Sequence, residues 1–249
     1  MIGKLTSTCA VLGLAFSAPA QAAKWTYVGP EGADRWGQLH TDFELCERGI
    51  MQSPVELGQA NAVADISVSA NWQAGPLTIL NNGHTVQANF AAGSTMMSGG
   101  KAFNLLQVHF HTPSEHTLDG EHFPLVGHFV HASDDGELAV LGVMYTQGAA
   151  NAEMQKLVDA APAAKAEAVA VEGVSIDPNK LLPANDGAID VYRYMGSLTT
   201  PPCSEGVNWH VASTPVEVSA GQIAVLEGIM GMNARPVQLL NGRLLVAPE

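Results

Sequence analysis

The sequence is poor in basic residues and, beyond its first residues, has no long apolar run. It contains 11 Lys and Arg against 24 Asp and Glu, a formal net charge of −13 at pH 7. An acidic surface disfavours nucleic acid and anionic membranes, so we expect neither as a partner. No later stretch reaches the roughly 20 apolar residues that a membrane-spanning helix needs. The acidity indicates solubility and identifies no substrate.

Internal repeats, Pro/Ser-rich linkers and long charge runs are also missing. The 25 Gly and 14 Pro are spread along the whole chain. With no break in composition there is no obvious place to divide the chain, and its length suits one large domain with its own core. We therefore predict a single domain over residues 23–249.

The chain begins with the features of a secretory signal peptide. Lys4 supplies a positive charge, Cys9–Phe16 an apolar stretch, and Ala20-Gln21-Ala22 a small-x-small cleavage site. The apolar stretch is too short for a membrane anchor. We therefore predict that residues 1–22 are removed and that the protein is exported to the periplasm. Export to the extracellular space is the alternative.

Cysteine is scarce, with three in the chain, and Cys9 leaves with the signal peptide. An exported protein that keeps two cysteines, here Cys46 and Cys203, suggests one disulfide. In the chain-entropy model, closing so long a loop stabilises the fold by roughly 5 kcal/mol. Two buried free thiols are the alternative.

Short β-branched or alternating runs, separated by Gly, Asn and Asp, predict strands along most of the chain. Helical signals are few: Ala150–Val158, ended by Pro162, and Ala220–Met230 with Ser219 as its N-cap. The segment Ala160–Ala170 fits neither pattern. The order of elements predicts a large sheet with peripheral helices rather than alternating βαβ units. The predicted strands are Ile66–Ser69, Leu77–Leu80, Thr85–Asn89, Phe103–Phe110, Leu125–His131, Ala139–Tyr145, Ile189–Tyr194, Val207–Ala212 and Val237–Leu240.

The main chemical signal lies in the histidines, of which there are nine. On a strand, residues i and i+2 point to the same face, so His109 and His111 project together while Phe110 packs on the other side. An H-x-H pair alone is weak evidence for a metal site, because a core histidine is more often hydrogen-bonded than metal-bound.

A third histidine strengthens the case for a metal. His128 lies in another strand-like run, and Asp119-Gly120 between the two runs is typical of a hairpin. If the runs pair as antiparallel neighbours, His128 faces the H-x-H pair. Three neutral imidazoles with one open position form a catalytic zinc site, whereas a structural zinc has four protein ligands, usually including cysteine. Spacing alone leaves a zinc site and three structural histidines equally open.

The remaining histidines have simpler interpretations. Under strict alternation, His116 and His131 point away from the H-x-H face, which predicts histidines of the core. His122 lies near the hairpin tip, and we expect it to be exposed.

Ordered blocks across the mature chain resemble the α-carbonic anhydrases. The resemblance implies a mostly β (α+β) domain built on a large, predominantly antiparallel, twisted central sheet with a few peripheral helices. It places zinc at the bottom of a cone-shaped cleft. The blocks are Trp25-Thr26-Tyr27, Trp36-Gly37, Gln52-Ser53-Pro54-Val55, Asn81-Asn82-Gly83-His84, Gln107–Thr117, Leu138–Gly142, Tyr194–Cys203 and Arg235–Gln238.

The resemblance also implies a role for each matching residue. The reacting centre comprises three zinc ligands, a hydroxyl that accepts a hydrogen bond from zinc-bound hydroxide, a carboxylate that orients this hydroxyl, and a proton shuttle. These are, in order, His109, His111 and His128; Thr199; Glu115; and His84. Around them lie a hydrogen-bond partner of the first ligand, an apolar wall for carbon dioxide, a polar neighbour of bicarbonate and a disulfide. These match Gln107; Val130, Val140, Leu198 and Trp209; Thr200; and Cys46 with Cys203.

The implied activity is the zinc-dependent, reversible hydration of carbon dioxide to bicarbonate and a proton. Zn²⁺ is the expected cofactor, the expected partners are carbon dioxide, bicarbonate and water, and anions or sulfonamides are expected inhibitors. The resemblance also allows a homodimer. A non-catalytic carbonic-anhydrase-like module and a periplasmic zinc-buffering protein are the alternatives. Retention of the three histidines disfavours the first, and their place in apolar strand-like runs disfavours the second.

One position departs from the family pattern. The family usually has a glutamate two residues before the third ligand, where this chain has Val126. Losing a carboxylate that supports a metal ligand typically costs about 10–100-fold in metal affinity or activity. We therefore expect weaker zinc retention or slower turnover than in a relative that keeps the acid.

Overall fold

The computed structural model describes residues 24–184 and 187–249, so the predicted signal peptide lies outside the described residues. Strands dominate. They are β1 (Ala62–Ala64), β2 (Ser67–Asn71), β3 (Gly75–Asn81), β4 (Val86–Asn89), β5 (Thr95–Ser98), β6 (Lys101–His111), β7 (Thr117–Leu118), β8 (Glu121–His122), β9 (Leu125–Ala132), β10 (Leu138–Gln147), β11 (Ala166–Ile176), β12 (Ile189–Ser197), β13 (Glu205–Ala212), β14 (Val216–Val218) and β15 (Leu245–Pro248).

Helices are short by comparison. The α-helices are α1 (Trp36–Leu39), α2 (Leu45–Arg48), α3 (Ala152–Ala160) and α4 (Ala220–Met230), and 3-10 helices cover Gly29–Glu31, Ala33–Arg35, Thr41–Phe43, Leu57–Gln59 and Pro178–Leu181. Within residues 24–184 and 187–249, none of the helices is long and apolar enough to cross a membrane.

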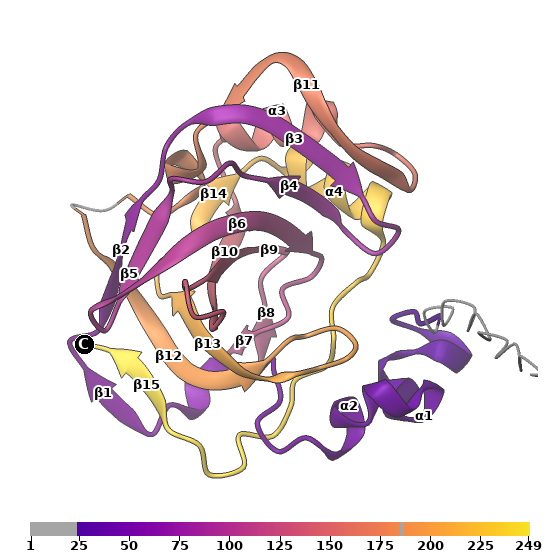
Figure 1. Cartoon of the computed structure of the whole chain (residues 1–249), viewed down its shortest axis with the longest axis vertical. Coiled ribbons are helices and arrows are strands. Elements are labelled where there is room, and N and C mark those ends of the chain that lie inside the picture. The colour runs from indigo at the N-terminus through magenta and orange to yellow at the C-terminus, as the bar shows by residue number, and fades with distance from the viewer. Residues whose placement is uncertain (1–23, 185–186) are drawn as a thin grey trace, which may run out of the picture.

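One large twisted sheet forms the body of the molecule, with the helices around its edges (Figure 1). Its strands follow the order β1-β15-β12-β13-β10-β9-β6-β4-β3-β11, and β2, β5 and β14 join at the side. Most neighbours are antiparallel, while β1 pairs with β15, and β10 with β13 and β14, in parallel. The predicted mostly β fold with a central sheet is confirmed.

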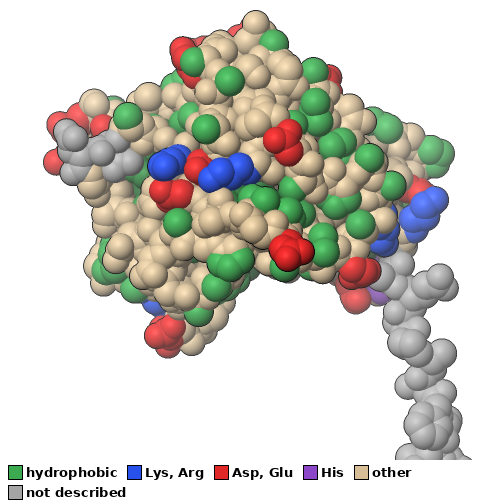
Figure 2. All heavy atoms as spheres, turned by 90° about the horizontal axis from the view of Figure 1, so that it is seen from above, with side chains coloured by type: hydrophobic (Ala, Val, Ile, Leu, Met, Phe, Trp, Pro, Cys, Tyr) green, Lys and Arg blue, Asp and Glu red, His purple; other side chains and the backbone are tan. Residues whose placement is uncertain are grey.

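Charged side chains are dispersed over the surface. On the face shown in Figure 2, the basic side chains are few and lie close to acidic ones. Lys101 is an example from the structure, since its Nζ lies 3.1 Å from Asp135 and 2.9 Å from Glu137. Exposed ion pairs of this kind contribute little to stability.

Two helices cover one end of the sheet beside β3, β4 and β11 (Figure 1). The predicted helix Ala220–Met230 is confirmed, and its N-cap Ser219 forms a capping box with Gln222. The other helix begins at Ala152, two residues later than predicted, because the Asn151 side chain accepts hydrogen bonds from the first turn and so caps the helix there.

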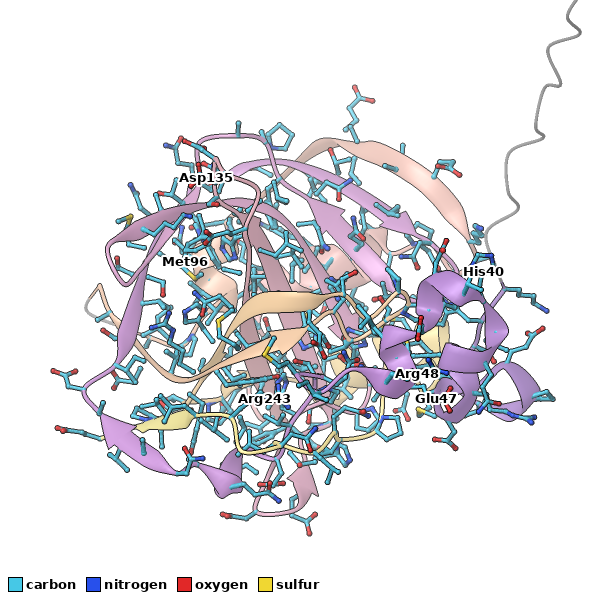
Figure 3. The ribbon with its side chains drawn as sticks, turned by 60° about the horizontal axis from the view of Figure 1, so that its bottom comes forward. His40, Glu47, Arg48, Met96, Asp135 and Arg243 are labelled. Carbon is cyan, nitrogen blue, oxygen red and sulfur yellow. A yellow bond between two sulfur atoms is a disulfide. The ribbon has the colours of Figure 1, made fainter. Side chains whose placement is uncertain are left out.

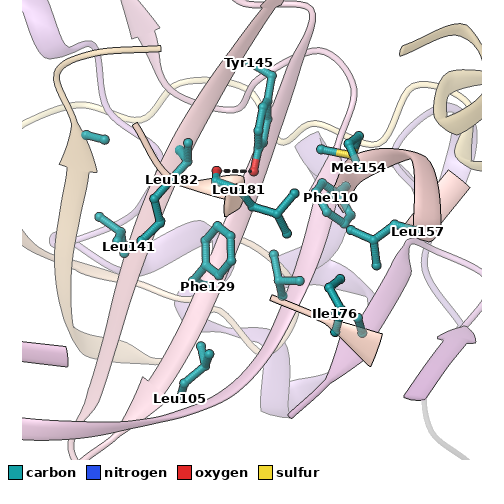
Figure 4. Close-up of a cluster of buried hydrophobic side chains, with 14 of the residues drawn as sticks. Leu105, Phe110, Phe129, Leu141, Tyr145, Met154, Leu157, Ile176, Leu181 and Leu182 are labelled. Carbon is teal, nitrogen blue, oxygen red and sulfur yellow. Dashed lines mark hydrogen bonds between the residues drawn. The ribbon is translucent and has the colours of Figure 1, made fainter. Parts of the chain in front are cut away.

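The main core lies between these helices and the sheet. Phe110, Phe129 and Tyr145 project from the central strands β6, β9 and β10 toward Met154 and Leu157 of α3 (Figure 4). All five side chains are buried. The Tyr145 hydroxyl satisfies its own hydrogen-bonding need by donating to the carbonyl of Leu181 at 3.0 Å. The opposite face of β6 and β9 carries His109, His111 and His128 beside the apolar Val126 and Val130.

One predicted strand is wrong. Val237–Leu240 is an extended loop, in which the N–H of Gln238 donates to the carbonyl of Pro54 at 2.8 Å. The Arg243 guanidinium donates to the carbonyls of Leu239 and Leu240. These isolated bonds satisfy the backbone without a ladder, so a short apolar run here does not indicate a strand.

The sequence patterns missed seven strands, of which β11 is the longest; the others are β1, β5, β7, β8, β14 and β15. Ala166–Ile176 forms the edge strand β11, which pairs with β3 through two register shifts. Most of its side chains are exposed, including the apolar Val169. An edge strand that buries neither face lacks the alternation by which strands are recognised, and this explains why its Ala-rich first half could not be assigned.

The predicted disulfide between Cys46 and Cys203 is confirmed, with an S–S distance of 2.08 Å. It ties α2, at one side of the molecule (Figure 3, Glu47 and Arg48), to the loop that follows β12. The buried Arg235 side chain reinforces the junction, because its guanidinium donates to the carbonyls of Cys46 and Ser53 and to Gln52 Oε1. The N-terminal segment is thus fixed to the loop that bears Thr199.

Two buried histidines lie on the side of the sheet that faces the core. The ring of His131 on β9 lies 5.5 Å from that of Trp72, tilted by 32°, and His210 on β13 hydrogen-bonds to the hydroxyl of Ser98 at 2.8 Å. Burial lowers the pKa of His131 to about 4 and that of His210 to about 3. Both residues are therefore neutral in the folded protein at pH 7, as expected for core histidines.

These two histidines predict a loss of stability in mild acid. In the unfolded chain their pKa returns to about 6.5, so the unfolded state binds more protons as the pH falls below that value. By about pH 5 the free energy of unfolding should drop by roughly 2 kcal/mol for each histidine. Urea unfolding between pH 7 and 5 measures the drop. In the control variant Ser98→Ala/His210→Leu, the free energy of unfolding should fall by about 2 kcal/mol less between pH 7 and 5 than in the parent. An equal fall in both proteins would contradict the assignment of His210 as a neutral core histidine.

Candidate metal centre

Three histidines converge on the polar face of the central strands. His109 and His111 share one face of β6, and His109 stands directly opposite His128 on the antiparallel neighbour β9. One ring nitrogen from each residue lies within 4.8 Å of the others. The predicted convergence of the H-x-H pair and His128 is confirmed. The predicted hairpin turn also lies between the strands, where Asp119 and Gly120 both have positive φ angles, 54° and 81°.

The hydrogen bonds of the first two histidines prepare them to bind a metal. Nδ1 of His109 lies 3.0 Å from Gln107 Oε1, and Nδ1 of His111 lies 2.7 Å from the carbonyl of Asn233. Both partners accept, so Nδ1 carries the proton and Nε2 keeps its lone pair. Nε2 of His111 is buried without any hydrogen-bond partner. A divalent metal is the group that satisfies such a nitrogen, and three imidazoles suit zinc.

The electrostatics of the triad also favour neutral ligands. Burial, and next the proximity of His111, lowers the pKa of His109 and of His128 well below the usual value. A metal ligand must be unprotonated, so these shifts remove the competition between proton and metal at neutral pH. The three residues therefore fit a zinc ion on donor type and spacing, and His109 and His128 fit it on protonation state as well.

A buried carboxylate lies beside the triad. Glu115 is fully buried and accepts a hydrogen bond from the N–H of Arg235 at 2.9 Å. Burial raises its pKa, and the interaction with the Thr199 hydroxyl opposes that rise. If the hydroxyl donates its only proton to Glu115, the oxygen of Thr199 can act toward the cleft only as an acceptor.

The cleft above the triad contains most of the residues predicted for it. It is lined by Trp25, Tyr27, Asn82, His84, Thr85, Gln87, Gln107, His109, His111, Val130, Leu198 and Thr200. Val140 and Trp209 do not line it. They lie in the apolar cluster directly behind, against which Val130 and Leu198 pack. The ring of Trp209 is 4.9 Å from that of His128, so the predicted apolar wall is two layers deep.

His84 occupies the turn between β3 and β4 and stacks on a tryptophan. The rings of His84 and Trp25 are 3.8 Å apart and nearly parallel, at 7°. Partial burial, and next the charge of Lys165, lowers the pKa of His84. The imidazole is therefore uncharged at neutral pH and able to take up a proton.

The other histidines follow the predictions, with one correction. His131 is buried and His122 is exposed, as expected. His116 is also buried, but strand alternation does not govern its direction, because β6 ends at His111. Its ring lies 6.2 Å from that of His128 and 4.8 Å from Trp209, so it borders the triad instead of pointing away from it.

Two further residues of the site carried no recognised role in the sequence. Asn233 accepts from His111 through its carbonyl and holds the backbone at Phe110 and Thr112 through its amide group. It lies 122 positions from His111 in the chain, and no local pattern marks it. Lys165, near His84, falls in the Ala-rich segment that could not be assigned.

Comparisons with known proteins agree with this arrangement. The sequence model of the eukaryotic-type carbonic anhydrases matches residues 31–248. A carbonic anhydrase of Pectobacterium carotovorum is 42% identical over 99% of this chain and 100% of the relative, and one of Nostoc sp. is 42% identical over 95% and 92%. The α-carbonic anhydrase of Thermovibrio ammonificans, solved with the inhibitor sulfanilamide, superposes with a TM-score of 0.85 at 41% identity, over 91% of this chain and 100% of that one.

These matches extend over nearly the whole chain and include the strands that carry the triad. The chain therefore belongs to the eukaryotic-type, or α, carbonic anhydrase family.

Proposed function

We propose that this protein hydrates carbon dioxide reversibly to bicarbonate and a proton, with zinc held by His109, His111 and His128. The observation that carries the proposal is the convergence of three imidazoles, two of them oriented through Nδ1, beside Glu115. A zinc ion bound there would lower the pKa of a water molecule and so supply hydroxide near neutral pH, chemistry for which carbonic anhydrases are the standard example. The residues around it bind, orient and move protons.

Thr199 is proposed to orient the nucleophile. Its hydroxyl interacts with the buried Glu115, and the carboxylate is held in turn by the N–H of Arg235. Once the Thr199 hydroxyl donates its proton to Glu115, its oxygen can only accept a hydrogen bond. It therefore binds an oxygen that still carries a proton, that of hydroxide or of bicarbonate, and fixes the direction of that oxygen. Orientation of this kind lowers the entropic part of the barrier.

The apolar wall is proposed to hold carbon dioxide. Val130 and Leu198 present hydrocarbon to the cleft, and the buried Val140 and Trp209 support them from behind. Carbon dioxide is small and has no hydrogen-bond donor, so this surface binds it without competition from tightly held water. Thr200 supplies a polar contact for the charged product.

His84 is proposed to carry the proton between the centre and bulk water. It lines the same cleft as His109 and His111 and is half-buried against Trp25. Its lowered pKa means that the ring is neutral above about pH 6.5, where it can accept a proton, and that it releases this proton readily to buffer.

The relatives suggest partners and a compartment. We propose that aromatic sulfonamides bind at the zinc, because the Thermovibrio enzyme was solved with sulfanilamide. The disulfide is consistent with the proposed export to the periplasm and with a mature domain over residues 23–249.

A second function remains open for one structural reason. Val126 offers no polar atom to its neighbour His128, and Nε2 of His128 has no hydrogen-bond partner. If this weakens the centre enough, the protein is a zinc-binding module without hydratase activity. Stoichiometric zinc in a protein that does not hydrate carbon dioxide would establish that function.

Val126→Glu tests how far the missing carboxylate limits the centre. The new side chain would lie on the same face of β9 as His128 and could accept the proton of its Nε2. We expect zinc affinity, measured by competition with a chelator, to rise by about 10-fold or more. Val126→Leu, which keeps the position apolar, should leave the affinity near that of the parent. Unchanged affinity in Val126→Glu would contradict the expectation.

A further inference from the structure

Two buried imidazole nitrogens beside the triad have no hydrogen-bond partner. They are Nε2 of His128 and Nδ1 of His116, on rings whose centres are 6.2 Å apart. Both residues are at most 1% exposed. Buried polar atoms are almost always satisfied by protein or by ordered water, so a shared pair of unsatisfied nitrogens indicates a bound group.

The protein groups around His128 cannot satisfy its Nε2. Val126 is apolar, and the indole N–H of Trp209 already donates to the carbonyl of Ser197 at 2.9 Å. Nδ1 of His128 lies on the side of Glu115, 3.8 Å from its Oε2, which is too long for a hydrogen bond. Assigning Nδ1 to the metal leaves the proton of the neutral ring on Nε2. That nitrogen is then a donor in need of an acceptor.

His116 offers the matching acceptor. Its Nε2 lies 2.7 Å from the hydroxyl of Tyr194, and that hydroxyl donates to Ser53 Oγ at 2.8 Å. A hydroxyl has one proton, so Tyr194 must accept from His116, and Nε2 of His116 carries the hydrogen. A fully buried imidazole with no counter-charge is neutral, and its Nδ1 therefore bears a lone pair.

We propose that one buried water molecule joins Nε2 of His128 to Nδ1 of His116, and that His116 thereby positions the third zinc ligand. The two nitrogens form no direct bond, and with the ring centres 6.2 Å apart one water can bond to both nitrogens at about 2.8–3.0 Å each. The bridging molecule must accept from Nε2 of His128 and donate to Nδ1 of His116. Water does both, whereas an anion only accepts and a metal cation does neither. The chain from His116 through Tyr194 to Ser53 fixes the tautomer and so makes up in part for the missing carboxylate, whose return in Val126→Glu is still expected to raise the zinc affinity.

This inference rests on the proposed zinc site, and two substitutions of His116 separate it from a merely structural role. His116→Gln places an amide near the position of Nε2, so it keeps the contact with Tyr194 and loses the acceptor that faces His128. His116→Asn keeps an oxygen near the position of Nδ1 and loses the contact with Tyr194. We expect zinc affinity to fall by about 10-fold in His116→Gln and to change much less in His116→Asn.

The affinities are measured by chelator competition on the mature protein, with thermal unfolding as the check on folding. The reverse order of the two variants, or equal affinities, would overturn the proposal. A high-resolution crystal structure of the zinc-loaded protein gives an answer that needs no variant. It should show a water within hydrogen-bond distance of both nitrogens. Zinc bound through Nε2 of His128, with Nδ1 donating to Glu115, would refute it. Failure of the unaltered protein to bind zinc at all would instead refute the proposed function.

Discussion

Replacing His109 by alanine is expected to abolish zinc binding and carbon dioxide hydration together. The substitution removes one of three zinc ligands. With two ligands left, the affinity should be too low for zinc to stay bound at assay concentrations. Enzymes typically accelerate their reactions by a factor of at least about 10⁶, so loss of the metal should lower the hydration rate by about 10⁴-fold or more. Stopped-flow hydration assays and zinc analysis on the same sample measure both losses.

The control for this substitution is His122→Ala. His122 lies only a few residues from His128 but is exposed and outside the triad. It should keep one zinc per chain and full activity. If His109→Ala kept activity, or if His122→Ala lost as much, the assignment of the metal centre would be wrong.

His84→Ala should produce the second-largest loss, and only under certain conditions. Removing a positioned proton carrier typically costs about 10²-fold or more, and the loss should be seen in weakly buffered solution at saturating carbon dioxide. A small imidazole buffer should restore most of the rate, because it can enter the cleft and carry the proton itself. Zinc content should not change, since His84 is not among the triad.

His40→Ala serves as the matched control, because His40 is an exposed histidine next to the short N-terminal helices (Figure 3). It should show neither the loss nor the rescue. A rate in His84→Ala that is independent of buffer concentration and equal to that of the parent would contradict the role of His84 as shuttle.

Much of the fold could be predicted because its central strands are buried, so that their β-branched and apolar residues form recognisable runs. Runs such as Leu125–His131 and Ala139–Tyr145 have β-branched and apolar residues that pack on the core, and the structure forms β9 and β10 over them. The errors lie where burial does not decide. Val237–Leu240 is apolar yet held by side chains in a loop, and β11 is a strand with little burial on either face.

The metal ligands could be predicted for a similar reason. On a strand, the spacing of His109 and His111 places both side chains on one face. The antiparallel pairing of β6 with β9 then brings His128 opposite them. Their partners could not be predicted from spacing. Asn233 reaches His111 from a loop after α4, and that contact depends on how the whole chain closes on itself.

His116 shows the same limit from the other side. Strand alternation assigned it to the core, away from the ligands, because the alternation was carried past His111, although Pro113 two residues later marks the end of β6. Only the tertiary arrangement reveals that its free nitrogen lies beside His128 with Val126 as the apolar neighbour. The departure at Val126 was visible in the sequence, and its compensation was not.

The measurement that tests the central claim most directly is stopped-flow carbon dioxide hydration on the mature, disulfide-bonded protein, with zinc determined on the same sample. We predict one zinc per chain and a hydration rate far above the uncatalysed reaction. Stoichiometric zinc without activity would leave only the zinc-binding module, with Val126 as the place to look for the cause. The absence of both zinc and activity, persisting after zinc is added back, would contradict the assignment of His109, His111 and His128 as a catalytic metal centre.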